Sequence, residues 1–443
     1  MAGQDKSVLY NLEKGYQITR VLGKEYLMIL RDKYSTPLAT IELCHNKISA
    51  VTPYRGAEND KDYIRLLQKF VQHRHFRLTK EAALNLSLNV VCKDGEEQYF
   101  TSAELTSSKL HDFFSSYDSL TVTFNNFRKR KLVIPKASKQ CCLELTHANV
   151  GKIVISANSH ASVNLRDNQF VNTLIIENSF NGTLNFSRSQ LLNIRFGDNC
   201  RCDVFCIHSS KCFEMNIGDV YSGILDIKDS CFHRLKAGYY CYAVIRLSEN
   251  WGRKDVIIGD SFRGSLLIDS VQVNNLEIGD DCRGRIAVSE KDNRQGIRHF
   301  EIADGFQGEI DLASSQRVEK VEVGAHAAGN INLSGCPSIQ SLMFDEKFSG
   351  RADLSDSGVV YIRAKDGCTG QFILLNCANL SLLKLPKDKK AEITVERMPK
   401  TVAADGRNFY YRFDEKDVPP EVSGPFYAPW LKKAKRFIRH YFS

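Results

Sequence analysis

Short alternations of apolar and polar residues recur at a nearly constant spacing over residues 151–375. Segments such as LIIENSFNGTLNF from Leu174, VIIGDSFRGSLLI from Val256 and FEIADGFQGEIDL from Phe300 share the template φ-x-φ-x-x-x-F-x-G-x-φ-x-φ, in which φ is apolar. The period of two within each half predicts short strands with one buried face. The segments between them are too short for helices of ~10–12 residues.

The slot written F, called the anchor here, recurs eleven times at a mean spacing of about 21 residues. The anchors are Ser159, Phe180, Cys200, Tyr221, Cys241, Phe262, Cys282, Phe306, Ala327, Phe348 and Cys368. Two places after the anchor, eight of the eleven coils carry Gly: Gly182, Gly223, Gly264, Gly284, Gly308, Gly329, Gly350 and Gly370. This column indicates either a positive φ or a close backbone approach between coils.

We therefore predict a mainly β protein built on a parallel β-solenoid of about 11 coils of ~21 residues. A third side of each coil is expected near Val171, Leu192, Phe213, Val318 and Ile339. A leucine-rich repeat has a similar period, but its L-x-x-L-x-L-x-x-N signature is absent. The longer interval around Ser289–Gly296 predicts a loop on the side of the solenoid.

The flanking regions do not repeat. Residues 1–80 predict a small α+β domain, with strands at 25–31, 38–44 and 48–52. A helix follows, whose apolar face contains Tyr63, Leu66, Leu67, Phe70 and Val71. Residues 81–145 predict a β-rich connector or N-terminal cap, with strands at 84–92, 97–105 and 119–125. The solenoid is expected over 146–400, a linker over 401–428 and a terminal helix over 429–443.

Residues 24–71 resemble the closing segment of the PcfJ-like family. The matching positions are Arg31, Pro37, Thr40, Glu42, Gly56 and Asn59. That family is associated with plasmids and mobile elements, so the resemblance implies a bacterial or phage setting and an adaptor domain, and it transfers no catalytic residue. The repeats also resemble bactofilin-type β-solenoids through G-x-φ-x-φ coils such as GNINL at Gly329–Leu333.

Composition narrows the class of protein. The 443 residues are 43% hydrophobic and 25% charged, which is ordinary for a globular chain, and no apolar run approaches the ~18 residues of a spanning helix. The N-terminus shows no secretory signal, so we expect the fourteen cysteines to be free thiols in a reducing cytoplasm. The net charge of +8 is concentrated in residues 128–140 and 428–443, which argues against a uniformly basic nucleic-acid binder.

The C-terminal segment predicts a short amphipathic helix that begins near Pro429. Its apolar face contains Trp430, Leu431, Phe437, Ile438, Tyr441 and Phe442, and its polar face contains Lys432, Lys433, Lys435, Arg436 and Arg439. Such a helix is typical of binding to an anionic membrane surface or to a partner. Capping of the open solenoid end and nucleic-acid binding are the alternatives.

Repeated cysteines and aspartates have structural interpretations. Cys200, Cys202, Cys206 and Cys212 have a spacing that suggests zinc, but the first three occupy the anchor, small and inward slots, which favours packing. Asp198, Asp219, Asp260, Asp280 and Asp304 form a column that predicts turns capped by their own Asp side chains, rather than a calcium or catalytic site. Asp226, Asp311 and Asp353 are expected on a solvated outer face.

These patterns predict a non-enzymatic interaction scaffold of bacterial or phage type, with no catalytic, cofactor-binding or metal-binding residue. We expect it in the cytoplasm, peripheral at the inner face of the membrane, with protein partners and self-association through the solenoid ends. One alternative is a carbohydrate-active β-helix enzyme or binding protein. Another is a nucleic-acid-binding protein of a mobile element, with Arg128, Lys129, Arg130 and Lys131 as its anion contacts.

Overall fold

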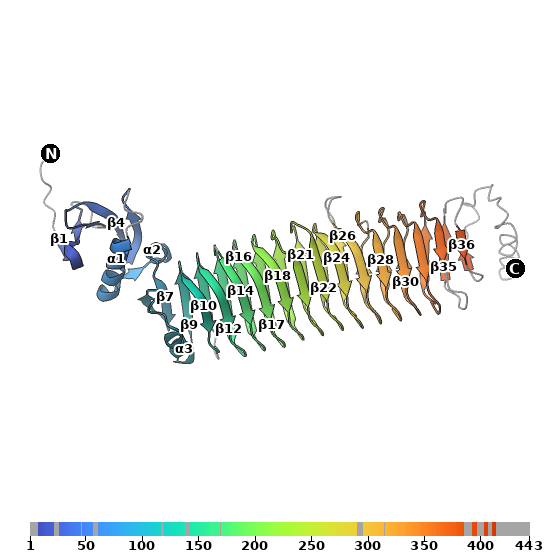
Figure 1. Ribbon diagram of the computed structural model, residues 1–443, viewed down its shortest axis with the longest axis horizontal. Helices are drawn as coiled ribbons and strands as arrows, with labels where there is room; N and C mark the ends of the chain where they lie inside the picture. The colour runs from blue at the N-terminus through green and yellow to red at the C-terminus, as the bar shows by residue number, and fades with distance from the viewer. Residues whose placement is uncertain are drawn as a thin grey trace. The chain divides into compact units, whose positions relative to one another are not determined.

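The chain folds as a mainly β protein, with 52% strand, 9% helix and a parallel β-solenoid of about 12 turns (Figure 1). This computed structural model describes residues 8–21, 26–45, 47–55, 61–116, 119–137, 141–168, 170–289, 296–313 and 315–384, and the strands at 392–396, 403–405 and 410–412. The solenoid prediction is thereby confirmed. The predicted helix at 429–443 lies outside the described residues. The linker predicted over 401–428 does so only in part, because the structure has strands at 403–405 and 410–412 that pair with the preceding coil.

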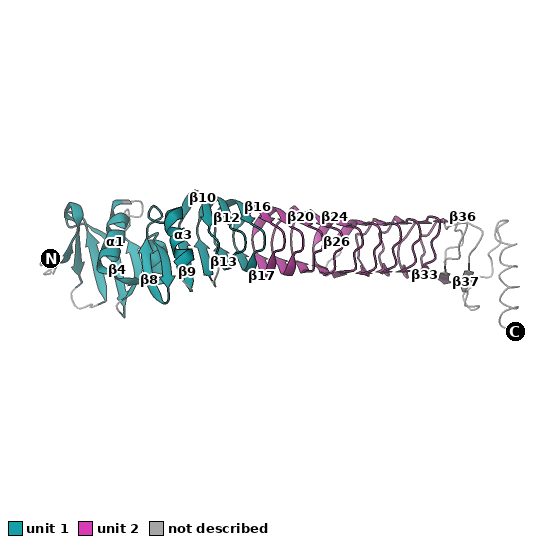
Figure 2. Ribbon diagram, turned by 90° about the horizontal axis from the view of Figure 1, so that it is seen from below, with its two compact units in different colours: residues 1–192 teal, residues 193–443 magenta. Residues whose placement is uncertain are grey.

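The chain divides into two compact units, residues 1–192 and 193–443 (Figure 2). Unit 1 begins with a six-stranded sheet in the order β1-β2-β3-β4-β5-β6. Its strands are β1 Val8–Asn11, β2 Gln17–Arg20, β3 Leu27–Arg31, β4 Pro37–Cys44, β5 Lys47–Pro53 and β6 Arg77–Leu78. The 3-10 turn η1 Glu13–Gly15 links β1 and β2, and the helix α1 Lys61–Arg74 follows β5. The predicted apolar face of this helix is buried against the sheet core, which contains Leu30 and Ile41.

The next segment of unit 1 contains the helices α2 Lys80–Asn85 and α3 Ser107–Ser116 and the hairpin β7 Asn89–Lys93 with β8 Glu96–Phe100. The strand predicted from residue 84 is wrong at its start, because Thr79 caps α2 by accepting a hydrogen bond from the backbone N–H of Ala82 at 3.2 Å. β7 pairs antiparallel with β9 Leu120–Asn125, and β9 pairs in parallel with β11. The solenoid ladder therefore begins at residue 120, with β7 on its N-terminal edge.

Two parallel ladders make up the solenoid. The even-numbered strands are β10 Arg128–Ile134, β12 Asn149–Ile155, β14 Phe170–Ile176, β16 Gln190–Phe196, β18 Lys211–Ile217, β20 Arg234–Ala237, β22 Lys254–Ile258, β24 Gln272–Ile278, β26 Gly296–Ile302, β28 Lys320–Val323, β30 Ser341–Phe344, β32 Tyr361–Ala364, β34 Leu382–Lys384 and β36 Ala403–Asp405. The odd-numbered strands after β9 are β11 Cys141–Thr146, β13 His160–Arg166, β15 Asn181–Ser187, β17 Arg201–His208, β19 Ser222–Lys228, β21 Val244–Ser248, β23 Ser265–Asp269, β25 Arg285–Ser289, β27 Glu309–Asp311, β29 Asn330–Asn332, β31 Arg351–Asp353, β33 Gln371–Leu375, β35 Glu392–Glu396 and β37 Tyr410–Arg412.

The anchor column fills the interior, since all eleven anchors are buried. Inward positions of the two ladders carry Leu, Ile, Val and Phe, so each coil buries apolar area against the next. Nine of the fourteen cysteines are buried, and all fourteen are free thiols. Packing by cysteine is thus confirmed for most of them.

The third side of the coil is the least accurate part of the prediction. The described strands form two ladders rather than three, and the expected third-side residues lie at the start of the even-numbered strands or just before them. Val171, Val318 and Ile339 are buried as expected, but Leu192 is 43% exposed and Phe213 is 56% exposed. The buried residues at these positions are Leu191 and Cys212, each one place earlier. A shift of one residue reverses the face of a strand, which accounts for the error.

The glycine column serves close approach rather than positive φ. Of its eight glycines, Gly223 has a positive φ, at 115°. The left-handed backbone belongs instead to the residue just before the anchor, for example Asn199 at 56° and Ser261 at 57°. A Cβ built at Gly264 would overlap the carbonyl oxygen of Ala243 in the preceding coil, so the column lets neighbouring backbones pack.

Candidate functional site

Aspartate side chains join successive coils at one turn of the solenoid in unit 2. Each Oδ1 accepts a hydrogen bond from the backbone N–H at the equivalent position of the next coil. The pairs are Asp198 with Asp219 at 3.0 Å, Asp219 with Tyr239 at 2.9 Å, Asp260 with Asp280 at 3.0 Å, Asp280 with Asp304 at 3.0 Å and Asp304 with Ala325 at 2.7 Å. The predicted turn role is therefore correct, but each Asp bonds the next coil rather than its own turn.

A glycine comes directly before most of the residues whose N–H groups these aspartates bind, and before Asp304 the position is Ala303. A Cβ built at Gly238 would meet Oδ1 of Asp219, and a Cβ built at Gly279 would meet Oδ1 of Asp260. The carboxylate of one coil thus occupies the space that a side chain of the next coil would need. The Gly-Asp dipeptide recurs because Asp supplies the acceptor for the next coil and Gly leaves room for the carboxylate of the preceding coil. We call this column of contacts the aspartate ladder.

Asp260→Ala should lower the free energy of unfolding by about 1 kcal/mol, because the backbone N–H of Asp280 loses its acceptor. The measurement is a urea unfolding curve. Glu277→Ala is the matched control, since it removes an outward carboxylate of the neighbouring coil, and its midpoint should stay within about 0.5 kcal/mol of the parent. Equal curves for Asp260→Ala and the parent would contradict the structural role of the ladder.

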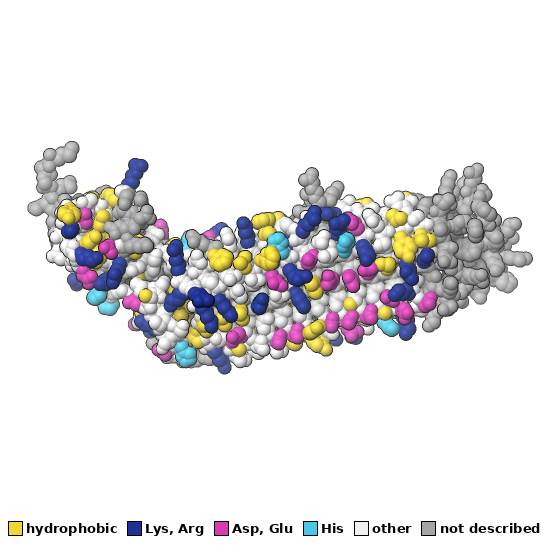
Figure 3. All heavy atoms as spheres, in the orientation of Figure 1, with side chains coloured by type: hydrophobic (Ala, Val, Ile, Leu, Met, Phe, Trp, Pro, Cys, Tyr) yellow, Lys and Arg dark blue, Asp and Glu magenta, His cyan; other side chains and the backbone are white. Residues whose placement is uncertain are grey.

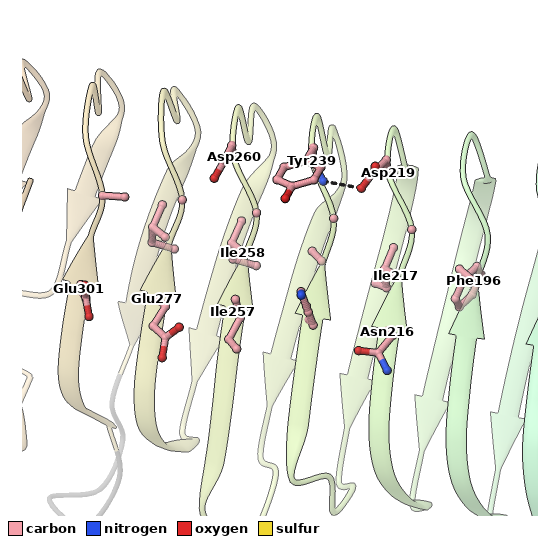
Figure 4. A pocket seen from close by; sticks show the side chains of 18 residues that line it. Phe196, Asn216, Ile217, Asp219, Tyr239, Ile257, Ile258, Asp260, Glu277 and Glu301 are labelled. Atoms are coloured by element: carbon pink, nitrogen blue, oxygen red, sulfur yellow. Dashed lines mark hydrogen bonds between the residues drawn. The ribbon is translucent and has the colours of Figure 1, made fainter.

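Beside the ladder, the outer face of unit 2 is hollowed into a shallow groove of about 600 Å³ (Figure 4). Gly218, Gly238, Gly259 and Gly279, from four successive coils, are among the residues that line it. Tyr239, 51% exposed, stands at one border. Glu277 and Glu301, which are in register on β24 and β26, lie along the strands on the other side. The groove thus runs across several coils beside the aspartate ladder.

A thiol, an imidazole and a carboxylate meet on the outer face of β17 and β19. The side chains are Cys206, His208 and Asp226, and their Sγ, ring nitrogen and carboxylate oxygen all lie within 4.8 Å of one another. Cys206 and His208 are two residues apart on one strand, and Asp226 is the register partner of Cys206 in the next coil. His208 Nε2 lies 3.9 Å from Asp226 Oδ2.

This cluster contradicts the inward placement predicted for Cys206. β17 has eight residues, and its register with β19 shifts between Cys202 and Phe205, as a β-bulge does. The extra residue turns Phe205 and Ile207 inward and Cys206 outward. The sequence carried this signal, because Phe205 and Ile207 are the larger apolar pair of the strand.

The four cysteines with zinc-like spacing do not converge. Cys200, Cys202 and Cys212 are buried, whereas Cys206 is on the outer face. Burial raises the pKa of the Cys202 and Cys212 thiols to about 12, so they are protonated packing groups at neutral pH. Burial, and then the nearby charge of Asp226, raises the pKa of Cys206 as well.

The predicted basic segment is part of β10 in unit 1, and Lys and Arg side chains gather over this strand in Figure 3. Arg128, Arg130 and Lys131 are exposed, and Lys131 is in register with Lys152 of β12. Lys129 differs, because its Nζ donates a hydrogen bond to the carbonyl of Leu105 at 2.8 Å. Three of the four candidate anion contacts therefore face solvent.

A cavity of about 750 Å³ lies in unit 1, between the α2–β8 segment and the first coils. Burial, followed by the hydrogen bond to Glu97 at 2.6 Å, raises the pKa of Tyr99 on its wall. The Tyr99 hydroxyl also accepts a hydrogen bond from the backbone N–H of Leu78. These contacts tie the hairpin to the N-terminal domain, which gives Tyr99 a structural role.

Comparisons with family models, with curated proteins and with solved structures found no match to this chain. The resemblances to the PcfJ-like family and to bactofilins stay predictions. Within the part of the chain that the structure describes, no helix is long and apolar enough to cross a bilayer.

Proposed function

We propose that this protein is a non-enzymatic interaction scaffold: a regular β-solenoid attached to an anionic membrane surface through residues 429–443. The aspartate ladder is the observation that carries the scaffold part of the proposal. The repeated carboxylates of the turn accept backbone hydrogen bonds from one coil to the next, so they hold the array in register. Outward side chains then lie in columns at the strand spacing of ~4.8 Å, as a regular support for a partner.

Outer columns of the solenoid change in chemistry from coil to coil, which suits a scaffold better than a catalytic cleft. Along one column Asp226 is followed by Arg246, Leu267 and Ala287. A catalytic site needs unlike groups that converge on one reacting atom, whereas a binding face needs a distinctive order of side chains. This order would let a partner recognise one position along the solenoid.

The attachment part of the proposal rests on the sequence of residues 429–443. This segment contains five Lys or Arg residues and no acidic residue. Its apolar residues are mainly aromatic, and they include Trp430, Phe437 and Phe442. Anionic headgroups attract such segments by ~1 kcal/mol per basic residue, and the aromatic rings favour the interface. A bacterial inner membrane rich in phosphatidylglycerol or cardiolipin is the proposed surface.

The test is co-sedimentation with vesicles. The full chain should bind vesicles that contain phosphatidylglycerol or cardiolipin and should not bind phosphatidylcholine vesicles. Deletion of residues 429–443 should abolish binding and leave the melting temperature unchanged. Replacing Lys432, Lys433, Lys435 and Arg436 by Gln should weaken binding strongly, and salt should weaken it in the parent.

The second basic segment supplies the matched control. An Arg128→Gln, Arg130→Gln, Lys131→Gln variant removes three exposed cations from β10 and should bind vesicles as the parent does. If this variant loses vesicle binding while the deletion of residues 429–443 retains it, the site that binds the anionic surface is β10 and not the C-terminal segment. A deletion of 429–443 that lowers the melting temperature, with no vesicle binding by the full chain, would favour a capping helix instead.

The groove favours a second candidate function, carbohydrate binding. Tyr239 offers an exposed ring, and Glu277 and Glu301 offer acceptors in adjacent coils. Glycan binding that Tyr239→Phe retains and Tyr239→Ala loses would support this candidate. Glycan turnover would support the enzyme alternative and contradict the scaffold.

A further inference from the structure

The cluster on the outer face of β17 and β19 is unlike any other group in the described part of the solenoid. Within the described residues, Cys206, His208 and Asp226 are the one set of three His, Cys or acidic side chains whose ligand atoms gather within 4.8 Å. A thiolate, an imidazole and a carboxylate are the ligand types of zinc sites. We propose that Cys206, His208 and Asp226 bind a Zn²⁺ ion on the outer face of the solenoid.

The geometry needs little adjustment to bind the ion. Zinc bonds of ~2.0–2.3 Å place ligand atoms roughly 3.3 to 3.8 Å apart in a tetrahedron. His208 Nε2 and Asp226 Oδ2 are already 3.9 Å apart, and every pair lies within 4.8 Å. All three side chains are partly buried on a rigid sheet, so small rotations of the side chains bring them to bonding distance.

His208 supplies an independent observation. Its Nε2 atom is buried and has no hydrogen-bond partner among the described residues. A buried polar atom without a partner is costly, and coordination to a metal would satisfy it. The same nitrogen is the one that faces Asp226.

Charges around the cluster also suit a divalent cation. A thiolate and a carboxylate together balance the two positive charges of the ion. Lys228, the register partner of His208, is engaged with Glu249, with 3.4 Å between Nζ and the carboxylate oxygen. Arg246 is the register partner of Asp226 in the next coil.

A nucleophilic cysteine is the alternative chemistry for these three residues, and the geometry disfavours it. In a catalytic triad the imidazole contacts the nucleophile and the acid through different ring nitrogens. Here Asp226 approaches Nε2 of His208 at 3.9 Å, and a single ring nitrogen lies within 4.8 Å of both the Cys206 Sγ and an Asp226 oxygen. The strands β17 and β19 thus bring three ligand atoms close together. A bound ion would link the two adjacent coils to which these strands belong.

The test uses the full chain, stripped of metal and then titrated with Zn²⁺ in competition with a chromogenic chelator. One Zn²⁺ should bind per chain and raise the melting temperature, because the ion binds the folded state. Cys206→Ser, His208→Gln and Asp226→Asn should each weaken Zn²⁺ binding by more than about 100-fold. This is more than the loss expected for a residue that only supports a ligand without touching the metal. Co²⁺ should give a thiolate charge-transfer band that Cys206→Ser abolishes.

The matched control is Cys44→Ser, because Cys44 is an exposed thiol whose Sγ lies 3.2 Å from Nδ1 of the neighbouring His45. This variant should bind Zn²⁺ as the parent does. The proposal is overturned if the full chain binds no stoichiometric Zn²⁺, or if Cys206→Ser binds it unchanged while its melting curve in the absence of metal matches the parent. Loss of the ion in Cys44→Ser alone would assign it to that other pair and would equally overturn the proposal.

Discussion

Raising the pH from 9 to 10 should lower the free energy of unfolding by about 5 kcal/mol, because buried thiols stay protonated in the folded chain while they ionise in the unfolded chain. Burial raises the pKa of five thiols to about 11 or 12: those of Cys202, Cys212, Cys241, Cys282 and Cys377. In this interval the folded state binds more protons than the unfolded state, so stability falls as the pH rises. Each thiol contributes somewhat more than about 1 kcal/mol over this interval, since the unfolded thiol is already partly ionised at pH 9, and the sum of about 6 kcal/mol is reduced by about 1 kcal/mol by one buried lysine.

Lys254 acts in the opposite direction. Burial lowers its pKa to about 8, and its Nζ donates hydrogen bonds to the carbonyls of Trp251 and Gly252 at 2.8 Å each. Between pH 8 and about 10.5 the unfolded chain binds this proton more strongly than the folded chain, so Lys254 adds stability as the pH rises. One lysine offsets about one thiol, and the net effect stays destabilising.

Urea unfolding in the presence of a non-thiol reductant, at intervals from pH 7.5 to 10.5, measures this dependence. Between pH 9 and 10, Cys241→Ala should reduce the slope by about 1 kcal/mol per pH unit. The interior accommodates Ala at this slot, since Ala327 is a buried anchor. Cys44→Ala removes an exposed thiol and should leave the slope as it is. Stability that is flat or rising from pH 9 to 10 would contradict the burial of the thiols.

Gly264→Val should lower the free energy of unfolding by about 3 kcal/mol, because the added Cβ overlaps the carbonyl oxygen of Ala243 in the preceding coil. Gly264 directly precedes β23, and its carbonyl accepts a hydrogen bond from the backbone N–H of Arg285 at 3.0 Å, so the backbone cannot move away without loss of hydrogen bonds. Valine adds two further methyl groups at a contact that already lacks room for one carbon.

Gly95→Asn is the control for this substitution. Gly95 has a φ of 87° in the turn between β7 and β8, with nothing within 4 Å of a Cβ built there, and Asn tolerates the left-handed region. Its cost should stay below about 1 kcal/mol. Comparable stability of Gly264→Val and the parent in urea would show that the glycine column is not a backbone constraint.

The solenoid could be predicted from the sequence because the residue pattern repeats at two spacings. One is the coil length of ~21 residues, and the other is the alternation of apolar and polar residues within each strand. The coil length appears in the spacing of anchors such as Phe180 and Phe262, and the strands appear in alternations such as Leu184 and Phe186. These positions are buried as the pattern indicated. The helix α1 was equally clear, since its apolar face recurs at helical spacing.

Features that depend on contacts between coils were harder to predict. An Asp after Gly indicates a turn, but no local pattern states that Asp219 bonds the backbone of Tyr239 rather than its own turn. The bulge in β17 displaced Cys206 from the interior, and with it the cluster of Cys206, His208 and Asp226 was missed. The alternation LNLSLNV after Lys80 resembles a strand, although the Thr79 cap begins a helix there.

The most direct test of the proposed membrane scaffold is the fluorescence of Trp430 in a Trp251→Phe variant. The chain has two tryptophans, and Trp251 is 53% exposed, so this substitution leaves Trp430 as the sole reporter without opening the core. Phosphatidylglycerol vesicles should shift the emission of Trp430 to the blue, and phosphatidylcholine vesicles should leave it unchanged. An emission maximum that is already blue without lipid, and that no vesicle alters, would contradict the proposal.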